Sequence, residues 1–104
     1  MAVPLGTLSL DGFEEKASEA AMMLKALSNE KRLMILCKLL EHGEMSVMTL
    51  NREVGLSQSA LSQHLARMRE ENIVGTRRDA QQIFYHVSDP RVSRILATLK
   101  TVYC

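Results

Sequence analysis

The chain has 104 residues, of which 46% are hydrophobic and 24% are charged, a composition typical of a soluble globular protein. This length predicts a single domain over residues 1–104. Aromatic residues make up only 4%, so aliphatic side chains must form a thin core, which often gains from a partner subunit. No apolar run approaches the roughly 18 residues that span a bilayer, and no secretory signal is visible, so we expect a cytoplasmic protein without a membrane partner.

The net charge of +1 does not by itself indicate a nucleic-acid binder. The charge is unevenly distributed, however, because acidic residues dominate residues 1–30 and basic residues dominate from Arg67 onward. The basic residues of that second part are Arg67, Arg69, Arg77, Arg78, Arg91, Arg94 and Lys100. A nearly neutral chain can therefore still present a basic surface locally.

Two helices are predicted to follow a flexible arm over residues 1–10. Asp11 and Glu14 have the spacing of a capping box for the first helix, residues 11–27. Ser28 is predicted to cap the second helix, from position 29 to about position 41. Cys37 falls on the apolar face of that helix and is expected to point inward, together with Leu33, Leu36 and Leu40.

Residues 45–71 have the pattern of a helix-turn-helix. A short helix is predicted over residues 45–54, and Gly55 lies in the turn that follows. In the next run, one apolar stripe at helical spacing predicts a packed face, formed by Leu61, Leu65 and Met68.

The opposite face of that helix carries hydroxyls, amides and arginines, whereas an ordinary solvated helix favours Glu and Lys pairs. Such side chains can reach base edges and phosphates. The candidates for base and groove contacts are Ser59, Ser62, Gln63 and Arg67, and the candidates for phosphate contacts at the helix start are Ser57 and Gln58. The alternative is an amphipathic helix pair whose outer face is merely solvated.

Residues 73–87 predict a β-hairpin immediately after the reading helix. Residues 73–74 and 83–87 have strand composition, and a basic, amide-rich segment over 76–82 connects them. Such a wing lies beside a DNA duplex, where side chains at its tip contact phosphates or enter the minor groove; the candidates are Arg77, Arg78 and Gln81. An exposed polar turn without a partner is the alternative.

Asp89 and Pro90 are predicted to open a last helix, residues 89–104, as N-cap and first helical residue. The apolar stripe of this helix must pack against another element to be shielded from water. The first helix of the same or another subunit is the obvious packing partner. The predicted fold is mainly α with a small β-hairpin, in the order α-α-α-α-β-β-α, which is a winged helix-turn-helix.

The order of elements and the local sequence resemble the ArsR/SmtB family of winged helix-turn-helix regulators. The resemblance rests on residues 24–33, 55–65 and 78–85. The family motif includes His64 as a candidate DNA contact, although this residue could equally support the helix from the border of its apolar stripe. It implies a homodimer that pairs through residues 11–27 and 89–104. Such a dimer presents two reading helices to successive major grooves of a palindromic double-stranded operator, about 34 Å apart.

Both familiar metal sites of this family are absent from the sequence. The arsenic-type site needs a cysteine cluster within residues 46–51, and the zinc-type site needs His and acidic ligands along the last helix. We therefore predict no metal and no cofactor. A metal-responsive regulator with a non-standard site stays open as an alternative, built from Cys37, Cys104 and a histidine such as His42 or His86.

Cys37 and Cys104 together resemble the sulfide- and persulfide-responsive branch of the family, the regulators of BigR, SqrR and HlyU type. The resemblance implies a redox-sensing dithiol: the reduced dimer binds its operator, and oxidation or persulfidation by a reactive sulfur species weakens binding. Alternatively, Cys37 is a small core residue and Cys104 an idle thiol.

Two further classes compete with a regulator. A thiol oxidoreductase needs a Cys-x-x-Cys pair or a cysteine beside a base, and the sequence has neither, so no enzyme is predicted. A winged helix used only for protein contacts would tolerate the loss of Arg67, Arg77 and Arg78.

Overall fold

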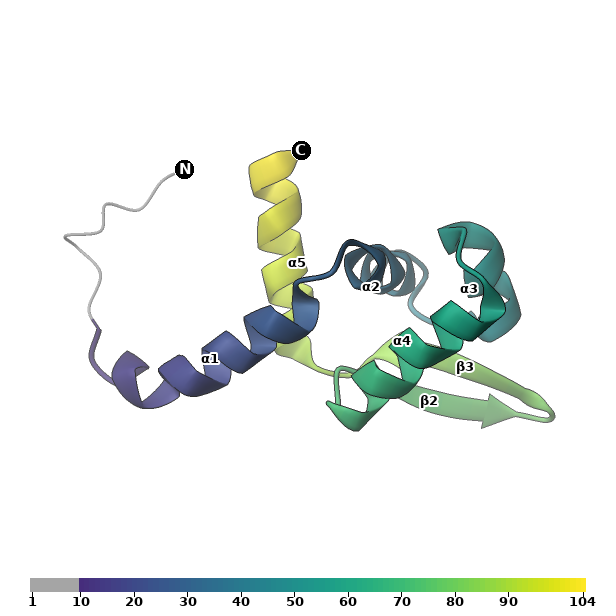
Figure 1. The fold of residues 1–104 in the computed structure, drawn as a ribbon, viewed down its shortest axis with the longest axis horizontal. Helices are drawn as coiled ribbons and strands as arrows, with labels where there is room; N and C mark the ends of the chain where they lie inside the picture. The colour runs from purple at the N-terminus through teal and green to yellow at the C-terminus, as the bar shows by residue number, and fades with distance from the viewer. Residues whose placement is uncertain (1–9) are drawn as a thin grey trace.

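The computed structural model describes residues 10–104, so the predicted arm lies almost wholly outside the described part of the chain. Its elements confirm a winged helix-turn-helix (Figure 1). In chain order they are α1 (Phe13–Leu27), α2 (Glu30–His42), β1 (Met45–Ser46), α3 (Val47–Val54), α4 (Gln58–Glu70), β2 (Val74–Asp79), β3 (Gln82–Val87) and α5 (Pro90–Tyr103).

The strands form an antiparallel sheet in the order β1-β3-β2. The hairpin closes at the pair Asp79 and Gln82 around a two-residue turn, in which Ala80 has a φ of 57°. The predicted connection over 76–82 is therefore wrong, because most of its residues pair within the strands. The helix predicted from Met45 is also wrong at its start, because Met45 pairs with Tyr85 as strand β1.

The core is aliphatic, as the composition predicted. Helix α4 buries the predicted stripe completely, with Leu61, Leu65 and Met68 at most 1% exposed. Helix α2 instead buries Ile35, Leu36 and Leu39. Several sides of α2 carry apolar residues, and packing against α3, the sheet and α5 selects a stripe shifted by one position from the predicted one.

The N-caps of α1 and α2 also differ from the predicted ones. Asn29, not Ser28, caps α2, because its side chain accepts hydrogen bonds from the backbone N–H groups of Lys31 and Arg32 at 2.9 and 3.1 Å. At α1 the cap position is Gly12, one residue after the predicted Asp11. The predicted cap of α5 is confirmed, since Asp89 accepts from the Arg91 backbone N–H at 2.9 Å.

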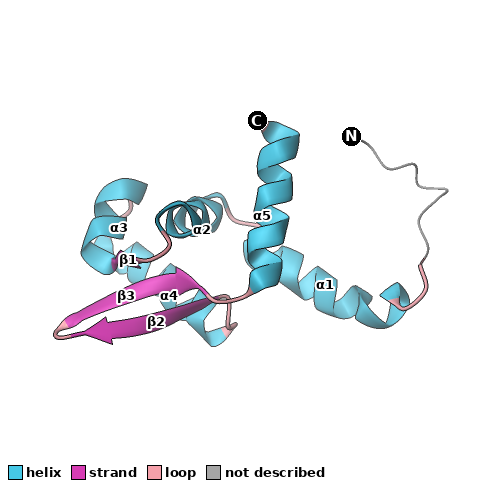
Figure 2. Ribbon diagram, turned by 180° about the vertical axis from the view of Figure 1, so that it is seen from behind, coloured by secondary structure: helices cyan, strands magenta, loops and turns pink. Residues whose placement is uncertain are grey.

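The molecule is elongated, with extents of 52 × 29 × 22 Å. Helix α1 projects at one end and the β2–β3 hairpin at the other, with α2, α4 and α5 between them (Figures 1 and 2). Within residues 10–104, no helix is long and apolar enough to cross a membrane.

Candidate DNA-binding surface and cysteine pair

The start of α4 is built by a turn and a cap. Gly55 adopts a left-handed φ of 66°, which lets the chain leave α3 and reverse its direction without steric strain. The Ser57 hydroxyl then accepts a hydrogen bond from the Ala60 backbone N–H at 3.1 Å. Ser57 is therefore the N-cap of α4.

The outer face of α4 gathers most of the predicted DNA contacts. Gln58, Ser59, Ser62, Gln63 and Arg67 are all exposed. Helical spacing places Ser59 and Gln63 opposite the buried stripe, with Ser62 and Arg67 flanking them. The face extends over more than two helical turns, and the only charged group among these five is Arg67. The arrangement provides hydrogen-bond donors and acceptors at the spacing of a surface that can enter a major groove.

His64 lies apart from this face. It is half-buried, and its Nδ1 accepts a hydrogen bond from Arg32 Nε at 3.4 Å. Burial and the nearby charge of Arg32 lower the pKa of His64 below its ordinary value, so the imidazole is neutral at neutral pH. The geometry is that of a buttress beneath the reading face.

The two wing arginines occupy different environments. Arg77 donates hydrogen bonds to both carboxylate oxygens of Glu44, at 2.6 and 3.1 Å, and its guanidinium lies 4.8 Å from the ring centre of Phe84. Arg78 is exposed and, as the next residue of the strand, points to the opposite face of the hairpin. Gln81 is exposed in the turn. The structure thus separates Arg77 from Arg78, which sequence reasoning had treated as equivalent.

Glu44 is a site residue that sequence reasoning missed. It precedes β1 and lies 33 positions before Arg77, so no local pattern connects the two. The hydrogen bond from Arg77 holds the pKa of Glu44 below its ordinary value.

A groove of about 670 Å³ joins the helix-turn-helix to the wing. Gln58 at the start of α4 and Gln81 in the hairpin turn both line it, together with residues of α3 that the sequence analysis did not single out, among them Thr49 and Arg52. Of the predicted DNA contacts, Gln58 and Gln81 therefore border the same depression.

Both cysteines are free thiols exposed to solvent. The inward orientation predicted for Cys37 is wrong, because the core stripe of α2 runs through positions 35, 36 and 39 and leaves Cys37 on the outer side. Cys104 follows the last residue of α5, and its backbone N–H donates to the Lys100 carbonyl at 2.9 Å. Helices α2 and α5 are in contact with one another.

The alternative metal site is not assembled within the described residues. In residues 10–104, no cluster of three or more His, Cys, Asp and Glu side chains could hold a metal ion. Cys37, Cys104, His42 and His86 therefore do not come together as a ligand set within one subunit.

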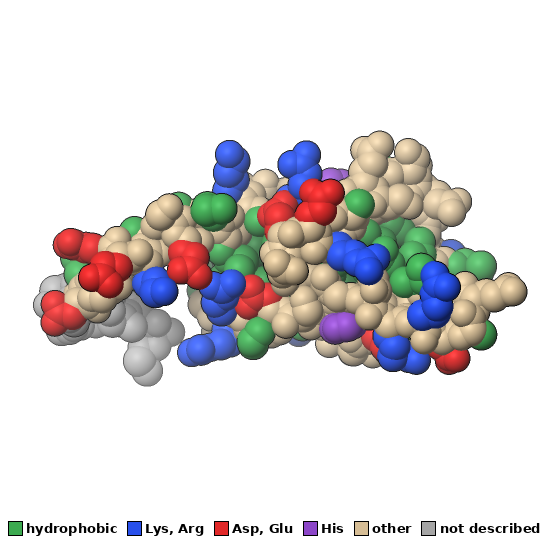
Figure 3. Space-filling model, turned by 90° about the horizontal axis from the view of Figure 1, so that it is seen from below, with side chains coloured by type: hydrophobic (Ala, Val, Ile, Leu, Met, Phe, Trp, Pro, Cys, Tyr) green, Lys and Arg blue, Asp and Glu red, His purple; other side chains and the backbone are tan. Residues whose placement is uncertain are grey.

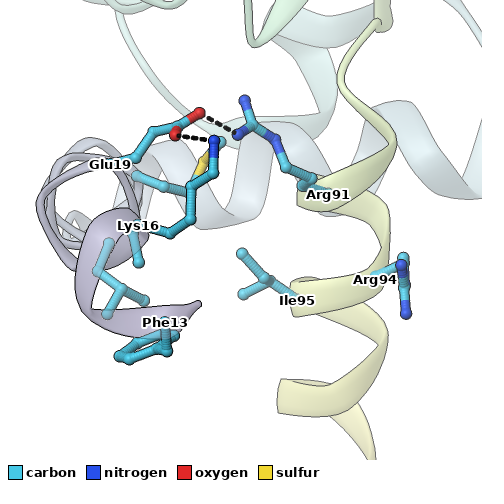
Figure 4. A pocket seen from close by; sticks show the side chains of 9 residues that line it. Phe13, Lys16, Glu19, Arg91, Arg94 and Ile95 are labelled. Atoms are coloured by element: carbon cyan, nitrogen blue, oxygen red, sulfur yellow. Dashed lines mark hydrogen bonds and ion pairs between the residues drawn. The ribbon is translucent and has the colours of Figure 1, made fainter. Parts of the chain in front are cut away.

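A second groove, of about 660 Å³, lies between α1 and α5 (Figure 4). Apolar side chains line most of it, with Ile95 of α5 pointing toward α1. At its rim, Glu19 bonds to Arg91 at 3.1 Å and to Lys16 at 3.5 Å. Seen from below, the α1 end of the molecule carries a group of acidic side chains, and basic ones are scattered toward the hairpin end (Figure 3).

Comparisons with known proteins agree with this architecture. Residues 29–76 match the family model described as "Bacterial regulatory protein, arsR family". The HTH-type transcriptional regulator YgaV of Escherichia coli K12 is 50% identical over 91 residues, which cover 88% of this chain and 92% of YgaV. The transcriptional activator HlyU of Vibrio cholerae is 44% identical over 97 residues, covering 93% and 89% of the two chains.

Solved structures give the same result. The transcriptional repressor BigR from Xylella fastidiosa superimposes with a TM-score of 0.87 at 40% identity, over 93% of this chain and 98% of that one. Reduced HlyU from Vibrio cholerae N16961 superimposes with a TM-score of 0.81 at 45% identity, over 91% and 99% of the two chains. These similar proteins are named as regulators of transcription, not as enzymes.

Proposed function

Because the chain belongs to the ArsR family of bacterial regulatory proteins and is a transcriptional regulator of the BigR and HlyU type, we propose that it binds a palindromic operator as a homodimer. We propose further that a Cys37/Cys104 dithiol controls this binding. The observation that carries the DNA part is the exposed polar face of α4, set opposite a completely buried stripe. A protein acting on chromosomal operators works in the cytoplasm.

Helix α4 enters the major groove in this proposal. Ser59, Ser62, Gln63 and Arg67 meet base edges and the groove wall, whereas Ser57 and Gln58 at the helix start meet phosphates. His64 supports α4 from behind, because its Nδ1 is already engaged by Arg32.

The wing contacts the backbone mainly through Arg78 and Gln81. Both are exposed, whereas Arg77 is neutralised by Glu44 and stacked on Phe84 in the free protein. The groove between α3 and the hairpin supports this arrangement, because a phosphate strand running across it meets Gln58 and Gln81 together.

A second copy of the chain is the proposed cover of the α1–α5 surface. Large apolar side chains on these two helices remain exposed in one subunit: Phe13 at 52%, Met22 at 70%, Leu24 at 59%, Val102 at 66% and Tyr103 at 81%. A two-fold related copy buries the same residues on both sides, which removes apolar surface of both chains from water.

Exposure of both thiols supports the sensing role, since a sensor cysteine must be reached by its oxidant. The Cys104 thiolate attacks the sulfane sulfur of a persulfide RS–SH, forms Cys104–S–SH and releases RS⁻. The Cys37 thiolate then attacks the inner sulfur, forms the disulfide and expels HS⁻. The thiols are oxidised, and the sulfane sulfur is reduced to sulfide.

The bridge restrains α5 against α2. A direct disulfide requires α-carbons about 4.4–6.8 Å apart, and additional sulfur atoms in the bridge relax that requirement. Because α5 belongs to the proposed dimer surface, the restraint changes how the two subunits sit and therefore the separation of their reading helices. Losing a few phosphate contacts then weakens binding strongly.

The test begins with in vitro selection of duplexes from a random-sequence pool, using the reduced protein. Fluorescence anisotropy then compares reduced, diamide-oxidised and polysulfide-treated protein on the selected duplex. We expect at least about a tenfold loss of affinity after oxidation, and none in Cys37→Ser or Cys104→Ser. Equal affinity in all states removes the sensing role, and failure to select any duplex removes DNA recognition.

A further inference from the structure

One guanidinium links three parts of the fold that are distant in sequence. Arg32, in the first turn of α2, donates from Nη1 to the Ala26 carbonyl at 3.1 Å and from Nε to His64 Nδ1 at 3.4 Å. Its Nη1 also lies 4.0 Å from Glu71 Oε1 at the end of α4. The Arg32 side chain is only 16% exposed, so these contacts fix its position within the protein.

The contact with Ala26 lies where α1 joins the body of the protein. Ala26 and Leu27 are the buried residues of α1, Met23 packs against the core while partly buried, and the first part of the helix projects outward (Figure 1). The Ala26 carbonyl is in the last turn of α1, where carbonyl groups lack partners within the helix. Arg32 satisfies this carbonyl while it also bonds to His64, which lies at the border between the buried stripe and the outer face of α4.

We propose that Arg32 is a positioning residue that sets the angle between α1 and α4, and thereby the separation of the two reading helices in the dimer. This inference rests on the proposed homodimer and operator binding. It assigns to Arg32 a role in discriminating operators by the spacing of their half-sites, without any contact between Arg32 and DNA.

A small change in the angle between α1 and α4 produces a large displacement at the far end of α1. A helix of 15 residues is about 22 Å long, so a rotation of about 10° at its anchored end moves the far end by about 4 Å. One base-pair step is about 3.4 Å. A small error in the angle of α1 therefore changes the match to an operator by about one base pair.

His64 supplies the acceptor for this link. Neutral imidazole can accept from Arg32 at Nδ1, whereas protonated imidazole can only donate and repels the guanidinium. The charged groups that contact this site are Arg32 itself and Glu71, the latter at the limit of an ion pair.

The test uses the duplex selected with wild-type protein and versions in which the spacer between half-sites is one base pair shorter or longer. Wild type should lose at least about tenfold affinity on either altered spacer. Arg32→Gln should bind the three duplexes within about threefold of one another, because α1 is no longer fixed relative to α4. Lys31→Ala, next to it and exposed, should retain the wild-type discrimination.

Two further variants separate positioning from a folding defect. His64→Asn keeps an acceptor near the position of Nδ1 and should retain spacing discrimination, whereas His64→Leu should lose it. Binding to a duplex with a single half-site should be the same in Arg32→Gln and wild type. The inference is overturned if Arg32→Gln keeps the wild-type spacing discrimination. It is also overturned if Arg32→Gln loses both spacing discrimination and binding to the single half-site. A wild-type protein that binds no duplex overturns the proposed function instead.

Discussion

Arg77 and Glu44 form a two-bond pair, with Arg77 Nη2 2.6 Å from Glu44 Oε1 and Arg77 Nε 3.1 Å from Glu44 Oε2. The pair lies on the outer face of the hairpin and neutralises a guanidinium at the wing. In the free protein, Glu44 therefore competes with any phosphate for Arg77.

Glu44→Gln should strengthen operator binding because it releases Arg77 for a phosphate. The dependence of log affinity on log salt concentration should steepen by up to about 0.9, the value for one additional phosphate contact. Anisotropy titrations at several salt concentrations measure this. Glu53→Gln is the control, since Glu53 pairs with Lys38 at 3.3 Å on another face and its loss should leave the slope unchanged.

Arg78→Ala should weaken operator binding and lower the salt slope by about 1. Arg77→Ala should have a smaller effect, because Arg77 is already held by Glu44. The same titrations compare the two variants. Equal losses would show that the wing releases Arg77 fully on DNA and would contradict the different roles assigned to these residues.

Asn29→Ala should destabilise the protein by about 1 kcal/mol, because it removes the acceptor for two backbone N–H groups at the start of α2. Ser28→Ala should change stability by less than about 0.5 kcal/mol. Urea unfolding followed by circular dichroism distinguishes the two. A larger effect at Ser28 would contradict the cap assignment.

Leu24→Lys should produce a monomer at concentrations where wild type is a dimer, because it places a charge in the proposed subunit contact. Met48→Lys is the matched control, since Met48 on α3 is 69% exposed but lies outside the α1–α5 surface. Sedimentation velocity gives the oligomeric state. A Leu24→Lys variant that stays dimeric would move the interface elsewhere.

Acidification should reduce stability through His64. The pKa of His64 is lowered in the folded protein, so the unfolded chain binds this proton at higher pH. Stability therefore falls as the pH drops below the ordinary value of 6.5. As the pH is lowered from about 7.5 to about 5, the thermal midpoint of wild type should fall by more than that of His64→Asn, which lacks the titrating imidazole. A constant difference would contradict the shift.

The residues Leu61, Leu65 and Met68 illustrate what the sequence could predict. Helical spacing is a local property, so these residues identify the buried side of α4 and place the polar residues opposite it. The Asp89–Pro90 cap was likewise readable, because a cap acts on backbone groups within the next three residues.

Tertiary structure decided which side of α2 faces the core, which residue holds Arg77, and what His64 bonds to. Apolar residues surround much of α2, so only its packing neighbours determine that Ile35 is buried and Cys37 is exposed. The Arg77–Glu44 and Arg32–His64 contacts join residues 33 and 32 positions apart. Such contacts depend on how the whole chain packs, whereas hydrophobic periodicity and capping patterns reach only a few residues along it.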